Sequence, residues 1–132
     1  METTLFTKIV NGEIPAYKVA EDDRFLAFLD AFPTTKGHTL VIPKQQVDYI
    51  FDLDEEVYIG LMAFARKVAA AVEKAVPCKR IGLAVVGLEV PHTHVHLIPL
   101  NSMQDMNFAN KKQFSKEEFE DTASKIKAAY NG

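Results

Sequence analysis

Residues 91–99 read Pro91-His92-Thr93-His94-Val95-His96-Leu97-Ile98-Pro99 and hold three of the four histidines in this chain. Side chains alternate between the two faces of an extended strand, so we expect His92, His94 and His96 to project from one face. Two of the three residues that point the other way are apolar enough to meet a core. Imidazole nitrogens need polar partners when they are buried. A row of three histidines therefore indicates a site rather than a hydrophobic core.

Length and composition indicate one globular domain spanning residues 1–132. Apolar residues make up 48% of the chain and charged residues 25%, proportions typical of a folded protein rather than a disordered one. The net charge of −3 provides no electrostatic attraction to nucleic acid or to an acidic membrane, so we expect neither as a partner. We interpret the basic pair Lys111-Lys112 as solvated surface.

Cysteine content and the N-terminal residues bear on the compartment. Cys78 is the one cysteine, which excludes an internal disulfide and a cysteine-based zinc site. The first residues show neither the basic region nor the apolar run that a secretion signal requires. No window approaches the ~18 apolar residues of a membrane span. We therefore predict a cytoplasmic protein.

Periodicity and turn residues predict an alternation of short strands and helices. The predicted strands cover residues 16–21, 25–29, 38–43, 80–86 and the histidine stretch. The predicted helices cover residues 5–10, a long segment that ends before Pro77, and residues 115–130. Strands 16–21 and 25–29 are expected to form a hairpin, and strand 80–86 must run antiparallel beside the histidine strand because the connection is short.

Capping residues define the helix ends. Thr3 or Thr4 is expected to cap the first helix, and Ser115 with Glu118 forms a capping box for the last one. Asp52 with Glu55 resembles a capping box for the long helix. Gly60 inside that helix costs about 1 kcal/mol relative to alanine, so it is either tolerated or marks a close approach of another element.

Residue types and spacing alone leave three roles open for the histidine row. Neutral imidazole is a common zinc ligand, and alternate strand positions can share one ion. A neutral imidazole can also attack phosphorus or a carbonyl carbon and divide one difficult step into two easier ones. The third role is structural, with each ring satisfied by backbone or water. His38 lies outside the stretch, and it joins the site in either functional case.

Residues His92 to Ile98 resemble the signature of the histidine triad (HIT) family, in which histidines alternate with hydrophobic residues. Three earlier segments are similar to motifs of that family in the same order, namely residues 8–16, 21–23 and 36–44. The likeness covers about residues 5–100, which we take as the domain core, followed by a C-terminal extension. It is closest to the bacterial-type branch near the histidine triad nucleotide-binding proteins.

The resemblance implies an α+β fold with about five antiparallel strands, one long helix and short terminal helices. It also implies a homodimer in which the two sheets join. The implied activity is that of a nucleotidyl hydrolase or transferase. Such an enzyme acts at the α-phosphorus of purine nucleoside 5′-phosphate derivatives, phosphoramidates or related mononucleotide conjugates carrying AMP or GMP, through a covalent nucleotidyl-histidine intermediate. No cofactor is implied.

Carried over by position, the resemblance assigns a role to each histidine. His94 is the nucleophile, and His96 bonds a phosphate oxygen and helps to protonate the leaving group. His92 orients His94, partly through its backbone carbonyl, and His38 completes the cluster as a buried hydrogen-bond partner.

The resemblance also implies the substrate-binding residues. Asp30 matches the acidic residue that binds the ribose hydroxyls. An apolar base pocket is formed by Leu5, Phe6, Ile9 and Phe28, although helical periodicity alone favours a core role for the first three. In the turn before the histidines, the backbone N–H groups of Gly87, Glu89 and Val90 are candidate phosphate donors.

The chain departs from the family pattern at four places. Leu88 stands where many relatives have glutamine, and the strand at 81–86 is apolar where an asparagine is usual. Thr93 replaces a hydrophobic residue. Thr4 and Thr7 stand where some bacterial relatives carry zinc-binding cysteines, so we predict no structural metal.

These departures keep other functions open. A diadenosine polyphosphate hydrolase is a close variant of the same chemistry. A nucleotide-binding regulatory module with weak catalysis is a second alternative, favoured by the missing polar residues near Leu88. A zinc site on His92, His94 and His96 is a third.

Overall fold

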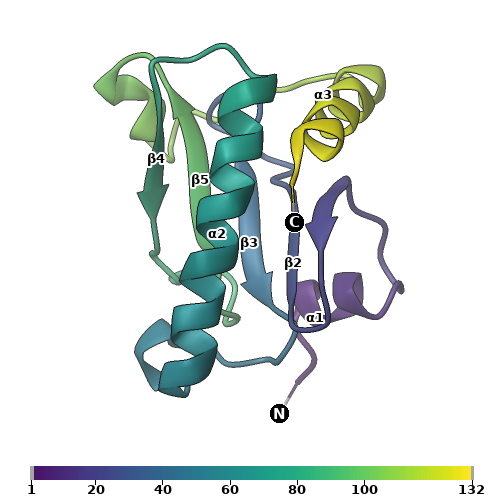
Figure 1. Ribbon diagram of the computed structural model, residues 1–132, viewed down its shortest axis with the longest axis vertical. Helices are drawn as coiled ribbons and strands as arrows, with labels where there is room; N and C mark the ends of the chain where they lie inside the picture. Colours follow the sequence, from purple (N-terminus) through teal and green to yellow (C-terminus); the bar gives the residue numbers. More distant parts are fainter. Residues whose placement is uncertain (1, 132) are drawn as a thin grey trace.

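Five antiparallel strands form one sheet in the order β1-β2-β3-β5-β4 (Figure 1). The computed structural model describes residues 2–131. The strands are β1 (Lys18–Glu21), β2 (Phe25–Leu29), β3 (Thr39–Pro43), β4 (Arg80–Ala84) and β5 (Val95–Leu100). The helices are α1 (Leu5–Val10), α2 (Glu55–Ala75) and α3 (Lys116–Ala129), with 3₁₀ turns at Ile50–Asp52 and Met103–Met106. This arrangement confirms the predicted α+β fold.

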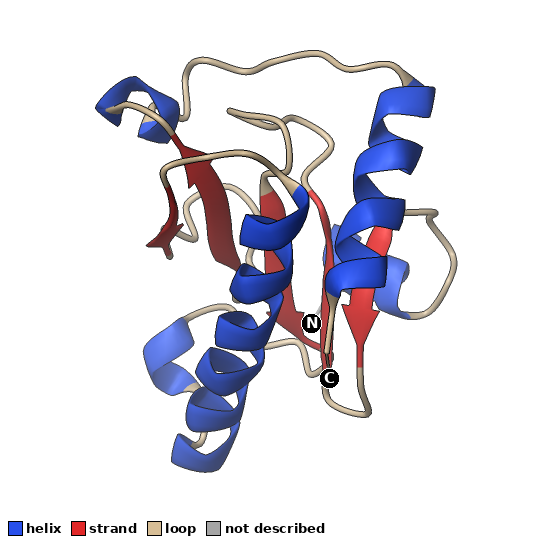
Figure 2. Ribbon diagram, turned by 45° about the horizontal axis from the view of Figure 1, so that its top comes forward, coloured by secondary structure: helices blue, strands red, loops and turns tan. Residues whose placement is uncertain are grey.

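Helices α2 and α3 cover one face of the sheet, and α1 packs on the opposite face (Figures 1 and 2). The main core lies between the sheet and α2, whose buried stripe includes Leu61, Phe64 and Val68. Alternation along β2 divides its side chains, so that Phe25 enters this core while Phe28 faces α1. The face that carries α1 is the one on which the site is built.

The N-cap of helix α2 lies two residues after the predicted one. Asp52 belongs to the preceding 3₁₀ turn, and the N-cap is Asp54, whose side chain makes no capping hydrogen bond. The predicted capping box of Asp52 with Glu55 is therefore wrong. A methyl group added at Gly60 would lie 3.0 Å from the Phe25 ring, so this glycine allows α2 to approach β2 of the same chain closely.

The terminal helices match the sequence interpretation closely. Thr4 caps α1, since its hydroxyl oxygen accepts a hydrogen bond from the Thr7 N–H at 3.1 Å. Ser115 and Glu118 form the predicted capping box at the start of α3. No helix within residues 2–131 is long and apolar enough to cross a bilayer.

The histidine stretch differs from the prediction in one respect. Strand β5 begins at Val95, so His92 and His94 precede it and only His96 lies within it. The backbone leaves the sheet here because the Thr93 N–H donates to the Val47 carbonyl at 2.7 Å, outside the strand ladders. The Thr93 hydroxyl donates to the same carbonyl at 2.8 Å, which satisfies a polar side chain that is 1% exposed.

Candidate functional site

A cavity of about 550 Å³ opens on the α1 face of the sheet. Its volume is in the range of small-molecule sites. Helix α1 and the end of β2 form one side, and the turn at residues 86–90 forms another. His94 and His96 line it directly, whereas His92 and His38 lie behind them and do not. The four histidines thus divide into two that face a ligand and two that support them.

The proton on the His94 ring is placed by its backbone partner. His94 Nδ1 lies 2.7 Å from the carbonyl oxygen of His92. A carbonyl can only accept, so Nδ1 must carry the hydrogen. In the neutral ring Nε2 then keeps its lone pair. The arrangement leaves His94 with an unprotonated nitrogen and holds the ring in one orientation.

A hydrogen-bond chain from Thr34 through His38 places the proton on His96. The Thr34 N–H donates to His38 Nδ1 at 3.1 Å, so His38 carries its hydrogen on Nε2. His38 Nε2 lies 2.9 Å from His96 Nδ1 and donates to it. His96 must therefore carry its own hydrogen on Nε2. His94 offers a lone pair and His96 a donor, so the two rings at the cavity present opposite chemistry.

His92 is held by partners on both of its ring nitrogens. Its Nε2 donates to the Pro43 carbonyl at 2.8 Å, and its Nδ1 accepts from the Thr4 hydroxyl at 2.9 Å. The Thr7 hydroxyl lies within hydrogen-bond distance of both His92 Nδ1, at 3.3 Å, and Gln46 Oε1, at 2.7 Å. Thr4 and Thr7, which stand where some bacterial relatives carry zinc-binding cysteines, thus form a hydrogen-bonded cluster that links α1 to His92.

Burial keeps three of the four rings uncharged. It lowers the pKa of His38 to about 3, and the positive charges of Lys111 and of protonated His94 add to the effect. Burial also lowers the pKa of His96 to about 3, with His38 and His94 as further causes and Asp30 opposing them. The pKa of His92 is lowered by burial despite the hydrogen bond to Pro43. Neutral rings are what the hydrogen-bond directions require.

The predicted apolar residues form one wall of the cavity. Leu5, Phe6, Ile9 and Phe28 all line it. The Phe6 ring packs edge-on against His94 with centroids 5.0 Å apart, and against Phe28 at 5.5 Å. Phe6 and Ile9 are also buried members of the smaller core, so this helix face contributes both to the core and to the cavity wall.

Asp30 and the turn before the histidines complete the predicted set. Asp30 lines the cavity, with Oδ1 accepting from the Phe32 N–H at 2.9 Å and Oδ2 3.6 Å from His38 Nε2. Gly87, Glu89 and Val90 also line it. Gly87 has a φ of 77°, a conformation that glycine adopts without strain. Leu88 lines the cavity too and is 88% exposed.

Among the lining residues that the sequence interpretation missed, Phe108 and Lys111 come from the C-terminal segment. The Phe108 ring lies 4.8 Å from the His96 ring, and the Lys111 ammonium is 5.5 Å from the centre of Phe108. Lys111 is exposed but not merely solvated surface. The only signal in the sequence for a role at the cavity was the presence of an aromatic and a basic residue in a mostly polar stretch.

The three histidines of the row do not converge on one metal position. Both ring nitrogens of His92 and Nδ1 of His94 are already engaged with protein groups. Within residues 2–131, the group of possible ligands that does converge is Asp30, His38 and His96, whose ligand atoms lie within 4.8 Å of one another. Two of those atoms, His38 Nε2 and His96 Nδ1, are joined by the hydrogen bond already described.

Comparison with known proteins gives consistent matches. The family model of the HIT domain matches residues 11–103. The chain is 35% identical to an uncharacterized HIT-like protein of Borreliella burgdorferi, covering 96% of this chain and 97% of that protein. It is 39% identical to the adenosine 5′-monophosphoramidase of Schizosaccharomyces pombe, covering 72% of each chain.

The fold has a similarly clear match among solved structures. A HIT-like protein of Bartonella henselae, described as involved in cell-cycle regulation, superposes with a TM-score of 0.84. The two chains are 34% identical, and the match covers 96% of each. The match extends past the triad into the C-terminal part of the chain.

Proposed function

This chain belongs to the HIT family, and we propose on that basis that it acts at the α-phosphorus of purine nucleoside 5′-phosphate derivatives. The substrates are phosphoramidates or related mononucleotide conjugates, and the products are the nucleotide and the released group. One observation carries the proposal. The His92 carbonyl holds the proton of His94 on Nδ1, so the lone pair of Nε2 belongs to the ring that lines a ligand-sized cavity.

The first step forms a covalent intermediate. His94 Nε2 attacks the α-phosphorus, a P–N bond forms, and the bond to the leaving group breaks. The ring becomes a cation whose Nδ1–H stays bonded to the His92 carbonyl, which stabilises the charge. The leaving group accepts a hydrogen bond from the His96 Nε2–H and takes its proton from water, while the His38 Nε2–H keeps His96 in this tautomer.

The second step returns the enzyme to its starting state. Water attacks the phosphorus and releases a proton to solvent, while the P–N bond breaks and His94 Nε2 recovers its lone pair. Another nucleophile in place of water would make the reaction a transfer. Gly87, Glu89 and Val90 line the same cavity as His94, and their backbone N–H groups are the donors we propose for the phosphoryl oxygens.

The nucleoside occupies the wall formed by α1 and β2. Phe6 and Phe28 supply flat apolar surface for a purine, with Ile9 and Leu5 beside them. Asp30 accepts hydrogen bonds from the ribose hydroxyls. Since Oδ1 already accepts from the Phe32 N–H, Asp30 Oδ2 is the oxygen best suited to the ribose.

Turnover of adenosine 5′-phosphoramidate, with diadenosine tetraphosphate as the comparison substrate, tests the proposal. We expect release of AMP from the phosphoramidate and, after acid-free quenching, a protein adduct one nucleotide heavier. Faster turnover of diadenosine tetraphosphate would favour the polyphosphate hydrolase. Tight AMP binding in calorimetry with turnover of neither compound would overturn the proposal in favour of a nucleotide-binding module.

We also propose that the chain is a homodimer. Strand β4 lies at the edge of the sheet, and its exposed Leu83 is followed three residues later by exposed Val86. An unpaired strand edge with apolar side chains favours pairing with a second copy. Sedimentation equilibrium should give twice the chain mass. A single-chain mass at micromolar concentration would contradict it.

A further inference from the structure

The C-terminal segment adds Phe108 and Lys111 to the cavity wall, beyond the residues matched by the HIT-domain model, which ends at residue 103. We propose that Phe108 and Lys111 form a subsite that binds an anionic leaving group. The inference rests on the proposed function, since it assigns the group released from the α-phosphorus. It makes conjugates with a carboxylate or phosphate on the leaving group the preferred substrate class.

The order of the aromatic rings places this subsite on the leaving-group side. The ring centroids of Phe6 and His94 lie 5.0 Å apart, and those of His94 and His96 are also 5.0 Å apart. The centroids of the His96 and Phe108 rings are 4.8 Å apart. Phe6 and Phe108 thus flank the two histidines from opposite ends of the row. The nucleoside lies against Phe6, and the hydrogen-bond donor to the leaving group is His96. A group beside Phe108 is therefore the one that departs.

Charge identifies what Lys111 binds. Among residues 2–131, Lys111 is the one lysine or arginine that lines the cavity. No carboxylate in that part of the chain forms an ion pair with it, and its recorded contact is the face of Phe108. Its positive charge also acts on His38 and His96. The ammonium thus acts on the histidines of the site, and within residues 2–131 no carboxylate forms an ion pair with it.

Hydrogen bonds to the loop at residues 33–34 hold the segment that carries Phe108 and Lys111 in place. The Lys112 N–H donates to the Pro33 carbonyl at 2.7 Å, and the Thr34 hydroxyl donates to the Asp105 carbonyl at 2.8 Å. Between these hydrogen bonds, Asn107 closes a turn. Its side-chain oxygen accepts from the Ala109 N–H, and its backbone carbonyl accepts from the Asn110 N–H. The turn holds Phe108 and Lys111 beside the cavity.

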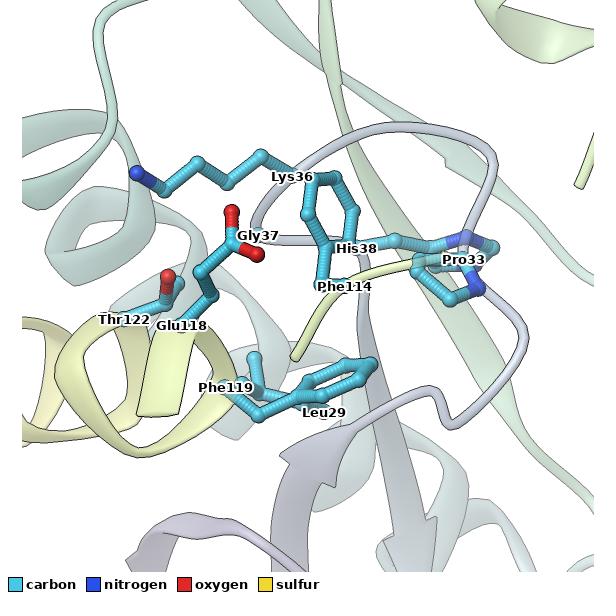
Figure 3. Close-up of a pocket in the computed structure, with 9 residues that line it drawn as sticks. All are labelled: Leu29, Pro33, Lys36, Gly37, His38, Phe114, Glu118, Phe119 and Thr122. Carbon is cyan, nitrogen blue, oxygen red and sulfur yellow. The ribbon is translucent and has the colours of Figure 1, made fainter. Parts of the chain in front are cut away.

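Phe114 anchors the far end of the same segment. Its ring packs edge-on against Phe119 of α3 at 6.0 Å. Figure 3 shows Phe114 with Pro33, Leu29 and Phe119 around one small hollow, next to the loop that carries His38. The loop that supports the histidine cluster and the segment that carries Lys111 are therefore packed together. Lys111 is positioned relative to His96 by the fold.

A matched pair of substrates tests the assignment. Adenosine 5′-phosphoramidates of glycine and of glycinamide have leaving groups of equal size that differ by one negative charge. In Lys111→Ala we expect kcat/KM to fall about tenfold for the glycine conjugate, the loss typical of a charge-assisted contact near solvent, and less than about twofold for the glycinamide conjugate. Lys111→Arg should retain most of the preference. Lys112→Ala, which keeps the backbone tie to Pro33, is the control and should match the wild type.

Equal losses for the two conjugates in Lys111→Ala would overturn the inference, because the lysine would then act on the nucleotide that both share. Wild-type protein that turns over neither conjugate would count against the proposed function instead. Calorimetry then decides the inference on its own, with ADP carrying an anionic group in the leaving position and AMP lacking it. Lys111→Ala should weaken ADP about tenfold and AMP little, and an unchanged ratio of the two affinities would refute the subsite.

Discussion

His94 Nδ1 and the carbonyl oxygen of His92 are 2.7 Å apart, which makes one residue of the row the orienting group of the next. The bond sets both the tautomer and the direction of the His94 ring. Attachment of phosphorus to Nε2 would make the His94 ring a cation, and the hydrogen bond to the His92 carbonyl would then be stronger. The side chain of His92 has a different task, since its two nitrogens attach the backbone of this turn to Pro43 and Thr4.

Replacing His94 by alanine should abolish turnover in a folded protein. The variant loses the only ring nitrogen placed to attack, and removal of a covalent nucleophile costs several orders of magnitude in kcat. Nucleotide binding should persist, because the apolar wall and Asp30 remain. Turnover assays alongside calorimetry with AMP and thermal unfolding check all three points. Turnover within tenfold of wild type would refute the nucleophile assignment.

Replacing His38 by phenylalanine should lower kcat by about 10–100-fold with little change in KM, the usual cost of losing a group that orients a functional histidine. The variant removes the donor that keeps the His96 proton on Nε2. Nitrogen-15 NMR should show His96 in one tautomer in the wild type and in a mixture in the variant. His38→Gln, whose amide can both accept from Thr34 and donate to His96, should recover much of the rate. A single unchanged His96 tautomer in His38→Phe would contradict the chain of hydrogen bonds.

Stability should fall as the pH is lowered from about 6.5. The folded protein holds His38 and His96 neutral with pKa values of about 3, whereas the unfolded chain binds protons near pH 6.5. Below pH 6.5 the unfolded state therefore binds more protons, and the free energy of unfolding decreases by up to about 1.4 kcal/mol per pH unit for each such group. The loss continues until the folded rings themselves titrate near pH 3.

Urea denaturation between pH 7 and pH 5 measures this effect while most carboxylates stay ionised. Two buried neutral histidines predict a clear drop in the midpoint across that range. His38→Gln has one titrating group fewer, so its midpoint should change less with pH. Equal pH dependence in the two proteins would show that His38 becomes protonated in the folded state.

Replacing Thr4 by valine should destabilise the protein by about 1–3 kcal/mol. The change removes the N-cap of α1, which alone costs about 0.5–2 kcal/mol, and it takes the hydroxyl donor away from buried His92 Nδ1. Thr4→Ser keeps the hydroxyl and should cost much less. Denaturant midpoints of the two variants check the comparison. Similar losses in both would assign the effect to the methyl group rather than to the hydrogen bonds.

Much of the fold follows from local patterns. The bounds of β2, the first helix and the capping box of α3 were readable because helix and strand periodicity, caps and breakers act within a few residues. The start of α2 was misassigned since Asp52 and Asp54 offer equivalent local signals, and only the preceding 3₁₀ turn separates them. The triad spacing and its resemblance to a family pointed to the face of the sheet on which the cavity opens.

Other features depend on groups that are distant along the chain. The alternation of the three histidines was readable, but strand β5 begins at Val95 because Thr93 bonds Val47, 46 residues earlier. Residues Phe108 and Lys111 reach the cavity because their segment is tied to the Pro33–Thr34 loop. Local periodicity contains no information about such long-range pairings.

The residue sequence alone shows that four imidazoles exist and that three of them alternate. Which nitrogen of each ring carries the hydrogen is a property of the tertiary structure, because it depends on whether the facing group is a donor or an acceptor. The Thr34 N–H, the His92 carbonyl and the Pro43 carbonyl supply those partners, from three separate parts of the backbone. Folding thereby gives chemically identical side chains different roles, a lone pair on His94 and a donor on His96.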